Sequence, residues 1–329
     1  MARAKPNPFA PEAILELLDA HGPPTLAEPV RAGRPRLLIG CSRLGEEAAA
    51  RRWAGSRGDG RGRVVPAATA TVLVDLAAHL GSPEPDLRGA PVDVQTDHLR
   101  RALRDAGRNG CERVAFLGLR HGGVLEPLVG LLDRSVLLVL ATCVEPVDGV
   151  APRHWERVRV LPPPDELLTE WLEARFAEQE TPLKSGVCAR ICAHAGPRSE
   201  DVLTLAGEVY RIGAGKKRIK SAHVDRALDR LVGRTAHLVL RVWETLSPLQ
   251  QNLLRALAAG EQQLFAARSR ARFGLRSTAS VARTLELLTE KGLVERSPRD
   301  GSYAFESPWV RRWVQREALP DVGIGIAID

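Results

Sequence analysis

The sequence has no long apolar run and no segment typical of export. Its longest apolar stretch, residues 136–144, is far shorter than the roughly 20 residues that a membrane-spanning helix needs. Basic residues near the N-terminus are not followed by the apolar segment of a secretory signal. These absences predict a cytoplasmic protein without a membrane partner.

Cysteines are few, scattered and odd in number, and most of the five lie in apolar segments. In a cytoplasmic protein this pattern predicts reduced, buried thiols and no disulfide framework. Cys188 and Cys192 lie four residues apart with His194 close by, but no second ligand pair follows at the spacing of a zinc site. We therefore expect no metal and no other cofactor.

Basic residues exceed acidic ones, and the net charge is +7. Residues 247–313 hold eleven Lys and Arg against six Asp and Glu, so this segment carries +5 and the remaining chain about +2. Positive charge favours polyanionic partners. If the protein binds nucleic acid, the last quarter of the chain is the expected contact region.

The first half of the sequence alternates apolar strands with helices. Strands are predicted at residues 36–40, 70–76, 113–119 and 135–143, with a short fifth at 155–161. Helices are predicted at residues 11–21, 45–53, 98–106 and 124–132. Near-continuous apolar strands that alternate with helices predict a parallel sheet covered on both faces. The glycine- and arginine-rich residues 55–63 are interpreted as a mobile loop or a contact to a nucleic-acid backbone.

Changes in pattern divide the chain of 329 residues into four parts. An α/β core is predicted over residues 1–163, an all-helical lid over 164–240, a winged helix-turn-helix over 241–316 and a tail over 317–329. In the tail, apolar residues alternate with period two. It is therefore expected to pair as an edge strand, within this chain or with a partner, or to stay disordered.

The winged helix-turn-helix is predicted from local start and stop signals. Ser247 and Pro248 suit the N-cap and first turn of a helix, and Gly260 ends it. A second helix is predicted at residues 262–273 and a third at 279–291. The inward-facing residues are predicted to be Leu249, Leu253, Leu254, Leu257, Val281, Leu285 and Leu288. Asp300 and Gly301 then form the turn of a hairpin, which completes the order of a winged helix.

The third helix of such a module enters the major groove, with its N-terminal residues nearest the bases. The predicted base-contacting residues are Arg276, Ser277, Thr278, Ser280, Arg283 and Thr284. The predicted phosphate contacts are Arg268, Arg270 and Arg272 on the second helix and Arg299 at the hairpin tip. The alternative is that these arginines form a solvated surface and the module docks a partner protein.

A strand, two glycines and a helix give residues 36–53 the layout of a phosphate-binding P-loop. Gly40 and Gly45 stand at the positions of its two glycines, but Lys and Ser or Thr should follow, and Glu46 and Glu47 stand there instead. Two carboxylates would repel the phosphates of a nucleotide. The third strand also lacks the acidic residues that hold Mg²⁺. The two glycines can equally form a simple tight turn, and hydrolysis is not expected.

The chain resembles the P-loop ATPases of the AAA+/STAND type known as archaeal-type ATPases, which are similar in plan to origin-recognition ATPases. The motifs that carry the resemblance are Asn7-Pro8-Phe9, Gly40 with Gly45, residues 72–75, 114–117 and 136–142, Gly196-Pro197-Arg198, and residues 243–250. The resemblance implies an AAA+ core whose second strand is residues 72–75, followed by a lid and a winged helix. It further implies that Thr142 ends the sensor-1 strand and that Arg198 is a sensor-2 arginine facing the γ-phosphate. As an alternative, Arg198 is a lid surface or capping residue.

Departures from the family pattern fall on the catalytic positions: Glu46 and Glu47 in Walker A, and Gly118 and Leu119 in Walker B. The sequence therefore predicts a catalytically inactive AAA+-like protein that binds double-stranded DNA through its winged helix, as a regulator or recruiting subunit, and does not bind ATP. One alternative is a protein-interaction adaptor with a protein partner or self-assembly. Another is a nucleotide-binding switch without hydrolysis.

Overall fold

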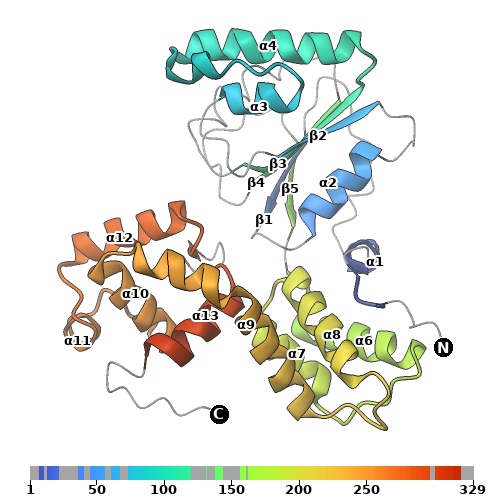
Figure 1. Ribbon diagram of the computed structural model, residues 1–329, viewed down its shortest axis with the longest axis vertical. Helices are drawn as coiled ribbons and strands as arrows, with labels where there is room; N and C mark the ends of the chain where they lie inside the picture. The colour runs from blue at the N-terminus through green and yellow to red at the C-terminus, as the bar shows by residue number, and fades with distance from the viewer. Residues whose placement is uncertain are drawn as a thin grey trace. The chain divides into compact units, whose positions relative to one another are not determined.

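The computed structural model describes residues 7–10, 13–21, 36–40, 45–55, 61–66, 73–119, 131, 138–143, 156–160, 162–296 and 301–319. They fall into two compact units (Figure 1). The α/β unit comprises Pro11–Pro163 with Arg198–Glu200, and the helical unit comprises Met1–Ala10, Pro164–Pro197 and Asp201–Asp329.

The α/β unit contains a five-stranded sheet in which every strand pairing is parallel, as predicted. Its strands are β1 (Arg36–Gly40), β2 (Gly62–Pro66), β3 (Arg113–Leu119), β4 (Leu138–Cys143) and β5 (Glu156–Val160), in the order β2-β3-β4-β1-β5. In this order β1 lies between β4 and β5, and Leu38 is opposite both Thr142 and Val158. The chain therefore leaves β1 toward one edge of the sheet and returns past it to β5.

Helices cover both faces of the sheet. Residues 114–117 of β3 are at most 1% exposed, although successive side chains point to opposite faces. On one face, Ala50 and Ala54 of α2 (Glu46–Gly55) join a core cluster that contains Ala115 and Leu117. The chain crosses from β1 to β2 in one direction and from β2 to β3 in the other. Right-handed crossovers therefore place α2 opposite α3 (Leu73–His79) and α4 (Val92–Arg108) (Figure 1).

The strand predicted at residues 70–76 is wrong, and so is its assignment as the second core strand. Residues 73–79 form helix α3, in which Leu73, Val74, Leu76 and Ala77 are buried. This spacing of i, i+1, i+3 and i+4 marks one face of a helix, and a short apolar run does not by itself separate helix from strand. The described second strand is β2.

Strand β2 begins inside the segment interpreted as a mobile loop, residues 55–63, so this interpretation is wrong for its last residues. Gly55 ends α2, and Gly62 begins β2. A Cβ atom on Gly62 would lie 1.8 Å from the carbonyl oxygen of Ala54. Gly62 is thus required for close approach of the strand to α2. Residues 56–60 lie outside the described part of the chain.

Other predicted elements of this unit are confirmed with small shifts. The leader helix is α1 (Ala13–His21), and the helix predicted at 98–106 is the longer α4. In α4 the buried stripe includes Leu99, Ala102 and Leu103, and the opposite face is exposed. The helix predicted at 124–132 lies outside the described residues except for Leu131.

The helical unit begins with four helices, as predicted for the lid. They are α6 (Asp165–Glu178), α7 (Val187–Ala195), α8 (Ser199–Gly213) and α9 (Ser221–Glu244). The segment Asn7-Pro8-Phe9 also belongs to this unit. Phe9 is 3% exposed, and its ring lies 4.6 Å from that of Phe176 and 6.3 Å from those of Trp171 and Tyr210. The leader therefore contributes a core side chain to helices far away in sequence.

The last part of the helical unit has the predicted order of three helices and a hairpin. It consists of α10 (Pro248–Ala258), α11 (Ala267–Arg272), α12 (Thr278–Glu290), and the antiparallel strands β6 (Val294–Arg296) and β7 (Tyr303–Phe305). We call these five elements the C-terminal module. Helix α13 (Pro308–Trp313) and the turn η3 (Val314–Ala318) follow. The second helix is shorter than the predicted 262–273.

The start and core of the C-terminal module are as predicted. The Ser247 hydroxyl accepts a hydrogen bond from the backbone N–H of Gln250, whose side chain accepts one from the N–H of Ser247. This capping box fixes the first turn of α10. Leu253, Leu285 and Leu288 are fully buried. Because α9 contacts α13, the lid and the module form one unit by contacts, and the four-part division of the chain stays a prediction.

No described helix has both the length and the apolar character needed to cross a membrane. Within the described part of the chain, no three His, Cys, Asp or Glu side chains are placed to hold a metal ion. Cys188 and Cys192 are buried free thiols, and burial raises the pKa of Cys188 to about 12. Residues 320–329 of the tail lie outside the described residues.

Candidate nucleic-acid interface

Helix α12 is held by the core of the C-terminal module along one face. Val281, Leu285 and Leu288 are buried in a cluster that also contains Leu253 and Phe305. The Ser277 hydroxyl accepts a hydrogen bond of 3.2 Å from the N–H of Ser280 and caps the helix. The helix is thus fixed in rotation and at its start, and its opposite face is oriented toward solvent.

Most of the predicted base-contacting residues lie on this exposed side. Arg276, Ser277, Thr278 and Arg283 are exposed, and Ser280 is half-buried. The Ser277 hydroxyl already serves the helix cap. The exposed guanidinium groups of Arg276 and Arg283 therefore provide the charge at the start of α12.

Thr284 does not belong to the exposed set, and the prediction that it contacts bases is wrong. It is 6% exposed, and its hydroxyl donates a hydrogen bond of 2.7 Å to the carbonyl oxygen of Ser280. Residue 284 lies three positions after Val281 and one before Leu285. It therefore falls on the inward face of the helix.

The three arginines of α11 differ in role. Arg268 is exposed, and the exposed Arg272 places its guanidinium carbon 5.1 Å from the centre of the Phe273 ring. Arg270 instead donates hydrogen bonds to the carbonyl oxygens of Phe265, at 3.2 Å, and Arg276, at 2.9 Å. These contacts join the segment before α11 to the segment before α12. Arg270 is therefore a structural anchor, and the prediction that it grips phosphate is not supported. Arg299 lies outside the described residues.

At the predicted nucleotide site, the structure describes Gly40 at the end of β1 and Gly45 directly before α2, and residues 41–44 lie outside the described residues. Gly45 has a φ of +98° and its carbonyl accepts a hydrogen bond from the N–H of Ala49. Gly40 ends β1, where the strand order reverses, and ligands of open α/β sheets bind beyond the strand ends at such a point. Glu47 is half-buried and pairs with Arg51 at 3.9 Å. The Glu46 side chain lies outside the described residues.

Two further predicted residues of the nucleotide site, Thr142 and Arg198, both belong to the α/β unit. Thr142 is in β4, beside β1, and its side chain lies outside the described part. Arg198 is 4% exposed and groups with the α/β unit together with Ser199 and Glu200, whereas Pro197 before them and Asp201 after them belong to the helical unit. Gly118, at the Walker B position, has a φ of +72° where the pairing of β3 with β4 is irregular. This left-handed conformation favours glycine over an acidic residue.

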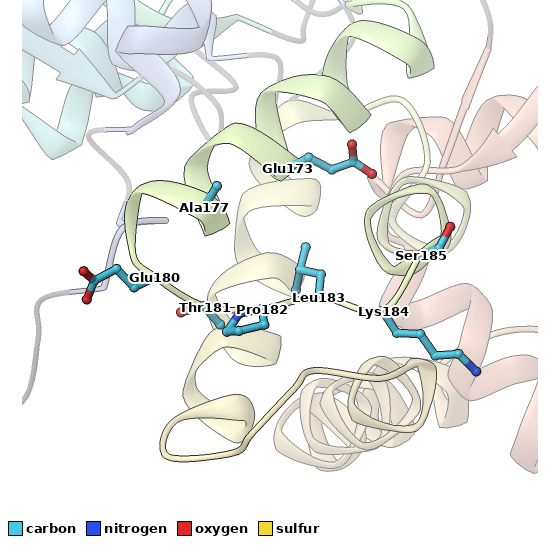
Figure 2. A pocket seen from close by; sticks show the side chains of 8 residues that line it. All are labelled: Glu173, Ala177, Glu180, Thr181, Pro182, Leu183, Lys184 and Ser185. Atoms are coloured by element: carbon cyan, nitrogen blue, oxygen red, sulfur yellow. The ribbon is translucent and has the colours of Figure 1, made fainter.

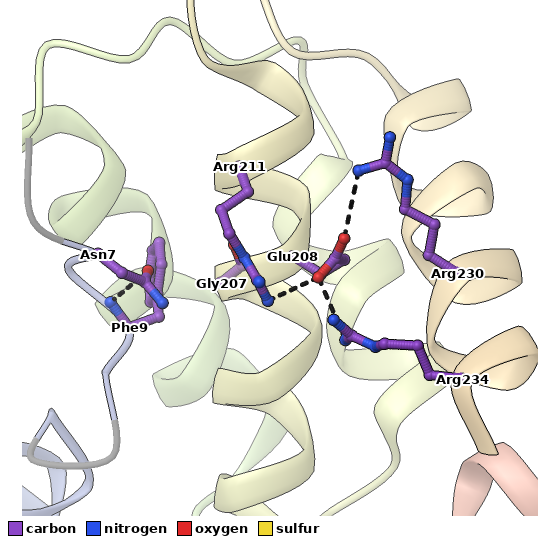
Figure 3. A network of polar contacts seen from close by, with 7 residues as sticks. All are labelled: Asn7, Phe9, Gly207, Glu208, Arg211, Arg230 and Arg234. Atoms are coloured by element: carbon purple, nitrogen blue, oxygen red, sulfur yellow. Dashed lines mark hydrogen bonds and ion pairs between the residues drawn. The ribbon is translucent and has the colours of Figure 1, made fainter. Parts of the chain in front are cut away.

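A second charged cluster, which the sequence reasoning missed, lies between α8 and α9. The buried carboxylate of Glu208 pairs with Arg211 at 2.6 Å, Arg234 at 3.2 Å and Arg230 at 3.5 Å (Figure 3). The arginine side chains are 53–64% exposed, whereas that of Glu208 is 4% exposed. One carboxylate therefore holds three guanidinium groups that remain open to solvent. The spacing of Arg230 and Arg234 by one helical turn is the sequence feature that could have indicated this cluster.

The helical unit also has an open pocket of about 590 Å³ where α6 ends. Glu173, Ala177 and the residues Glu180, Thr181, Pro182, Leu183, Lys184 and Ser185 line it (Figure 2). Figure 2 shows that the charged groups of Glu173, Glu180 and Lys184 point to different sides. Their charges do not converge, so the lining favours no single class of ligand.

Comparison with known proteins shows the fold. No protein-family model and no curated protein sequence matches the chain. A Walker-type ATPase of Pyrococcus abyssi is similar in structure with a TM-score of 0.58 and 16% identity, over 93% of this chain and 94% of that one. The ORC2 protein of Aeropyrum pernix gives a TM-score of 0.47 at 16% identity, over 95% and 92% of the two chains. The RuvB Holliday junction branch migration motor of Thermotoga maritima gives 0.44 at 14%, over 89% and 91%.

The chain therefore has the fold of the AAA+ ATPases, with a parallel α/β sheet and a helical lid, as its resemblance in sequence implied. At 16% identity the likeness extends to the fold alone. The fold gives no support to the expectation that ATP does not bind.

Proposed function

We propose that this protein binds double-stranded DNA through its C-terminal module, which acts as a winged helix, and that its AAA+ unit does not hydrolyse ATP. In this proposal the protein is a cytoplasmic regulator or the DNA-recruiting subunit of a larger assembly. The observation that carries it is the start of α12, where Arg276, Thr278 and Arg283 are exposed on a helix whose other face is fixed in a core.

The charge of the module supports contact with phosphates. Arg268 and Arg272 are exposed on α11, the helix that precedes α12. Arginine side chains are suited to phosphate because they donate several hydrogen bonds in a fixed plane. The C-terminal module thus combines an exposed face of α12 with positive charge on the preceding helix α11.

Loss of hydrolysis is supported by the catalytic positions. Walker A carries Glu46 and Glu47 in place of Lys and Ser or Thr, and Walker B carries Gly118 and Leu119 in place of acidic residues. Acidic side chains in the first turn of α2 stabilise that helix through its dipole, without a bound phosphate. The irregular end of β3 at Gly118 also differs from a strand that presents a carboxylate to Mg²⁺.

The test is a comparison of single variants in a duplex-binding assay by fluorescence anisotropy. Arg283→Ala and Arg276→Ala should each weaken binding by about 1–3 kcal/mol if they contact bases. Arg311→Ala is the matched control, because Arg311 is an exposed arginine on α13. Equal affinities for all three variants and the wild type would contradict the proposal.

A second candidate function is a nucleotide-binding switch without hydrolysis. It is favoured by the left-handed Gly45 before α2 and by Arg198, which is buried and groups with the α/β unit. Thermal denaturation with and without Mg-ATP tests it, because a ligand that binds only the native state raises the midpoint. A rise in the wild type that is lost in Arg198→Ala would favour the switch; no rise would remove it.

A protein-interaction adaptor is the third candidate, and the DNA assay also bears on it. An adaptor would show no binding to duplex at low salt. The exposed surface of α12 would then be available to a protein partner, and the arginine variants would affect capture of that partner.

A further inference from the structure

The connection between α8 and α9 presents basic side chains that the proposed function does not use. Lys216, Lys217, Arg218 and Lys220, which we call the basic loop, lie in seven residues between the two helices and are all exposed. Residues 205–234, which include this loop, hold eight Lys and Arg against three Asp and Glu. This local excess of +5 equals that of residues 247–313.

The basic loop is anchored through Ile219. Ile219 is fully buried; its N–H donates to the carbonyl of Pro182 at 2.9 Å, and its own carbonyl accepts from the N–H of Lys184 at 2.8 Å. A Cβ atom on Gly213 would lie 2.4 Å from the Ile219 side chain, so Ile219 packs directly over the end of α8. The backbone therefore holds the charged side chains outward, and ordering of the loop adds little to the cost of binding a partner.

Three of the four charges of the basic loop have no acidic partner among the described residues. In the described part, no acidic side chain lies within ion-pair distance of Lys216, Lys217 or Arg218. The nearby acidic residues are engaged elsewhere: Asp225 pairs with Arg190 at 2.7 Å, and Asp229 pairs with Arg316 at 3.6 Å.

The Glu208 cluster extends this positive surface. Arg211 lies in the last turn of α8, directly before the loop, and Arg230 and Arg234 follow on α9. Glu208 holds these three side chains from their buried side, so the cluster keeps an excess positive charge with its arginines more than half exposed (Figure 3). Guanidinium groups fixed in this way lose little rotational freedom when they bind an anion.

We propose that the basic loop, with the Glu208 cluster beside it, is a second contact surface for the phosphate backbone of duplex DNA. This inference rests on the proposed function of the C-terminal module and adds a contact outside that module. It assigns to the lid a sequence-independent role in affinity, while α12 reads the sequence. Because phosphate contacts release counterions, the surface should show itself in the salt dependence of binding.

The test compares the full chain with the triple variant Lys216→Ala/Lys217→Ala/Arg218→Ala. Three lost phosphate contacts should lower the slope of log K against log salt by between about two and three, at roughly 0.9 per contact. Between about 50 and 200 mM salt, the affinity of the variant should thus fall roughly 40-fold less than that of the wild type. The conservative variant Lys216→Arg/Lys217→Arg should keep the wild-type slope.

The matched control is Arg101→Ala/Arg104→Ala/Arg108→Ala, which removes the same charge from the exposed face of α4. It should keep the wild-type slope, and the midpoint of thermal denaturation of both triple variants should match the wild type. If both triple variants change the slope equally, or neither does, the basic loop is not a contact surface. If the loop variant instead loses binding only to vesicles that contain anionic lipid, the partner is a membrane and the inference is overturned.

Failure of this inference differs from failure of the proposed function. If Arg283→Ala weakens duplex binding and the loop variant matches the wild type, only the second surface is wrong. If the wild type binds no duplex at low salt, both are wrong.

Discussion

Arg270 allows the structural role of an arginine to be separated from DNA contact. Its side chain donates hydrogen bonds to the carbonyl oxygens of Phe265 and Arg276, at 3.2 and 2.9 Å. A hydrogen bond from a charged donor contributes about 1.5–3 kcal/mol when buried. Arg270 is only half-buried, so about 1 kcal/mol for each bond is appropriate. Arg270→Ala should therefore destabilise the helical unit by about 2 kcal/mol.

Thermal denaturation followed by circular dichroism measures this effect. For a unit of this size, the loss corresponds to a fall in Tm of roughly 4–8 °C. Arg268→Ala is the matched control, since Arg268 is an exposed neighbour on the same helix, and its stability should change by no more than about 0.5 kcal/mol. Arg270→Lys should be nearly as unstable as Arg270→Ala, because an ammonium group does not span both carbonyl oxygens. If Arg270→Ala keeps the wild-type Tm but loses duplex binding, Arg270 is a DNA contact and the structural assignment is refuted.

Three further predictions concern the fold. Phe9→Ala should destabilise the helical unit by about 3–5 kcal/mol in a urea titration, because Phe9 is a buried ring that packs among three other aromatic rings. Phe265→Ala is the control and should have little effect, because Phe265 is exposed. Equal effects of the two variants would mean that Phe9 does not pack against the helical unit. Gly62→Ala should lower the Tm of the α/β unit, because its Cβ atom would lie 1.8 Å from a carbonyl oxygen of α2. Gly89→Ala is the control, since a Cβ atom on Gly89 would meet no atom within 4 Å. An unchanged Tm for Gly62→Ala would contradict the close approach of β2 to α2. Burial raises the pKa of the Cys188 thiol to about 12, so the reactive thiolate is scarce at about pH 8 and increases only as the pH approaches that pKa. Peptide mass spectrometry after alkylation should find Cys188 modified in unfolded protein only, and rapid modification of native protein would show that the thiol is accessible.

Signals that act locally were sufficient to predict much of this fold. The capping box at Ser247, the glycines that end the three helices and the spacing of the leucines each depend on a few neighbouring residues. The parallel sheet was predictable because strands buried on both faces, such as β3, have continuous apolar sequences. These signals predicted the order of elements in the C-terminal module and most described elements of the α/β unit, but not β2 and α3.

Features that depend on tertiary contacts were not predictable in the same way. Gly62 is required because the carbonyl oxygen of Ala54 lies where a Cβ atom would be, and this contact appears only in the folded chain. In the sequence alone, the same glycine is equally compatible with a mobile loop. The short apolar segment that forms α3 is compatible with a strand by propensity. Thr284 is different, because its position three residues after Val281 already placed it on the inward face.

For the candidate site, the arginines of α11 and α12 could be named from the sequence. The sequence did not distinguish arginines that are free to contact DNA from arginines whose hydrogen bonds hold the fold. Arg268 and Arg270 are both arginines of one short helix, and only the structure shows that Arg270 bonds two carbonyl oxygens. The basic loop was missed because the charge outside the C-terminal module was averaged over the remaining chain. An excess of +5 in residues 205–234 is hidden in such an average by acidic segments elsewhere.

The most direct test of the central claim is the affinity of the wild-type protein for a generic DNA duplex at about 50 and 200 mM salt. If six or more arginine and lysine side chains contact phosphates, binding should weaken by about a thousandfold or more between these concentrations. Such a decrease is the result that we predict. No binding at about 50 mM salt, or binding that does not change with salt, would contradict the assignment of this protein as a DNA-binding protein.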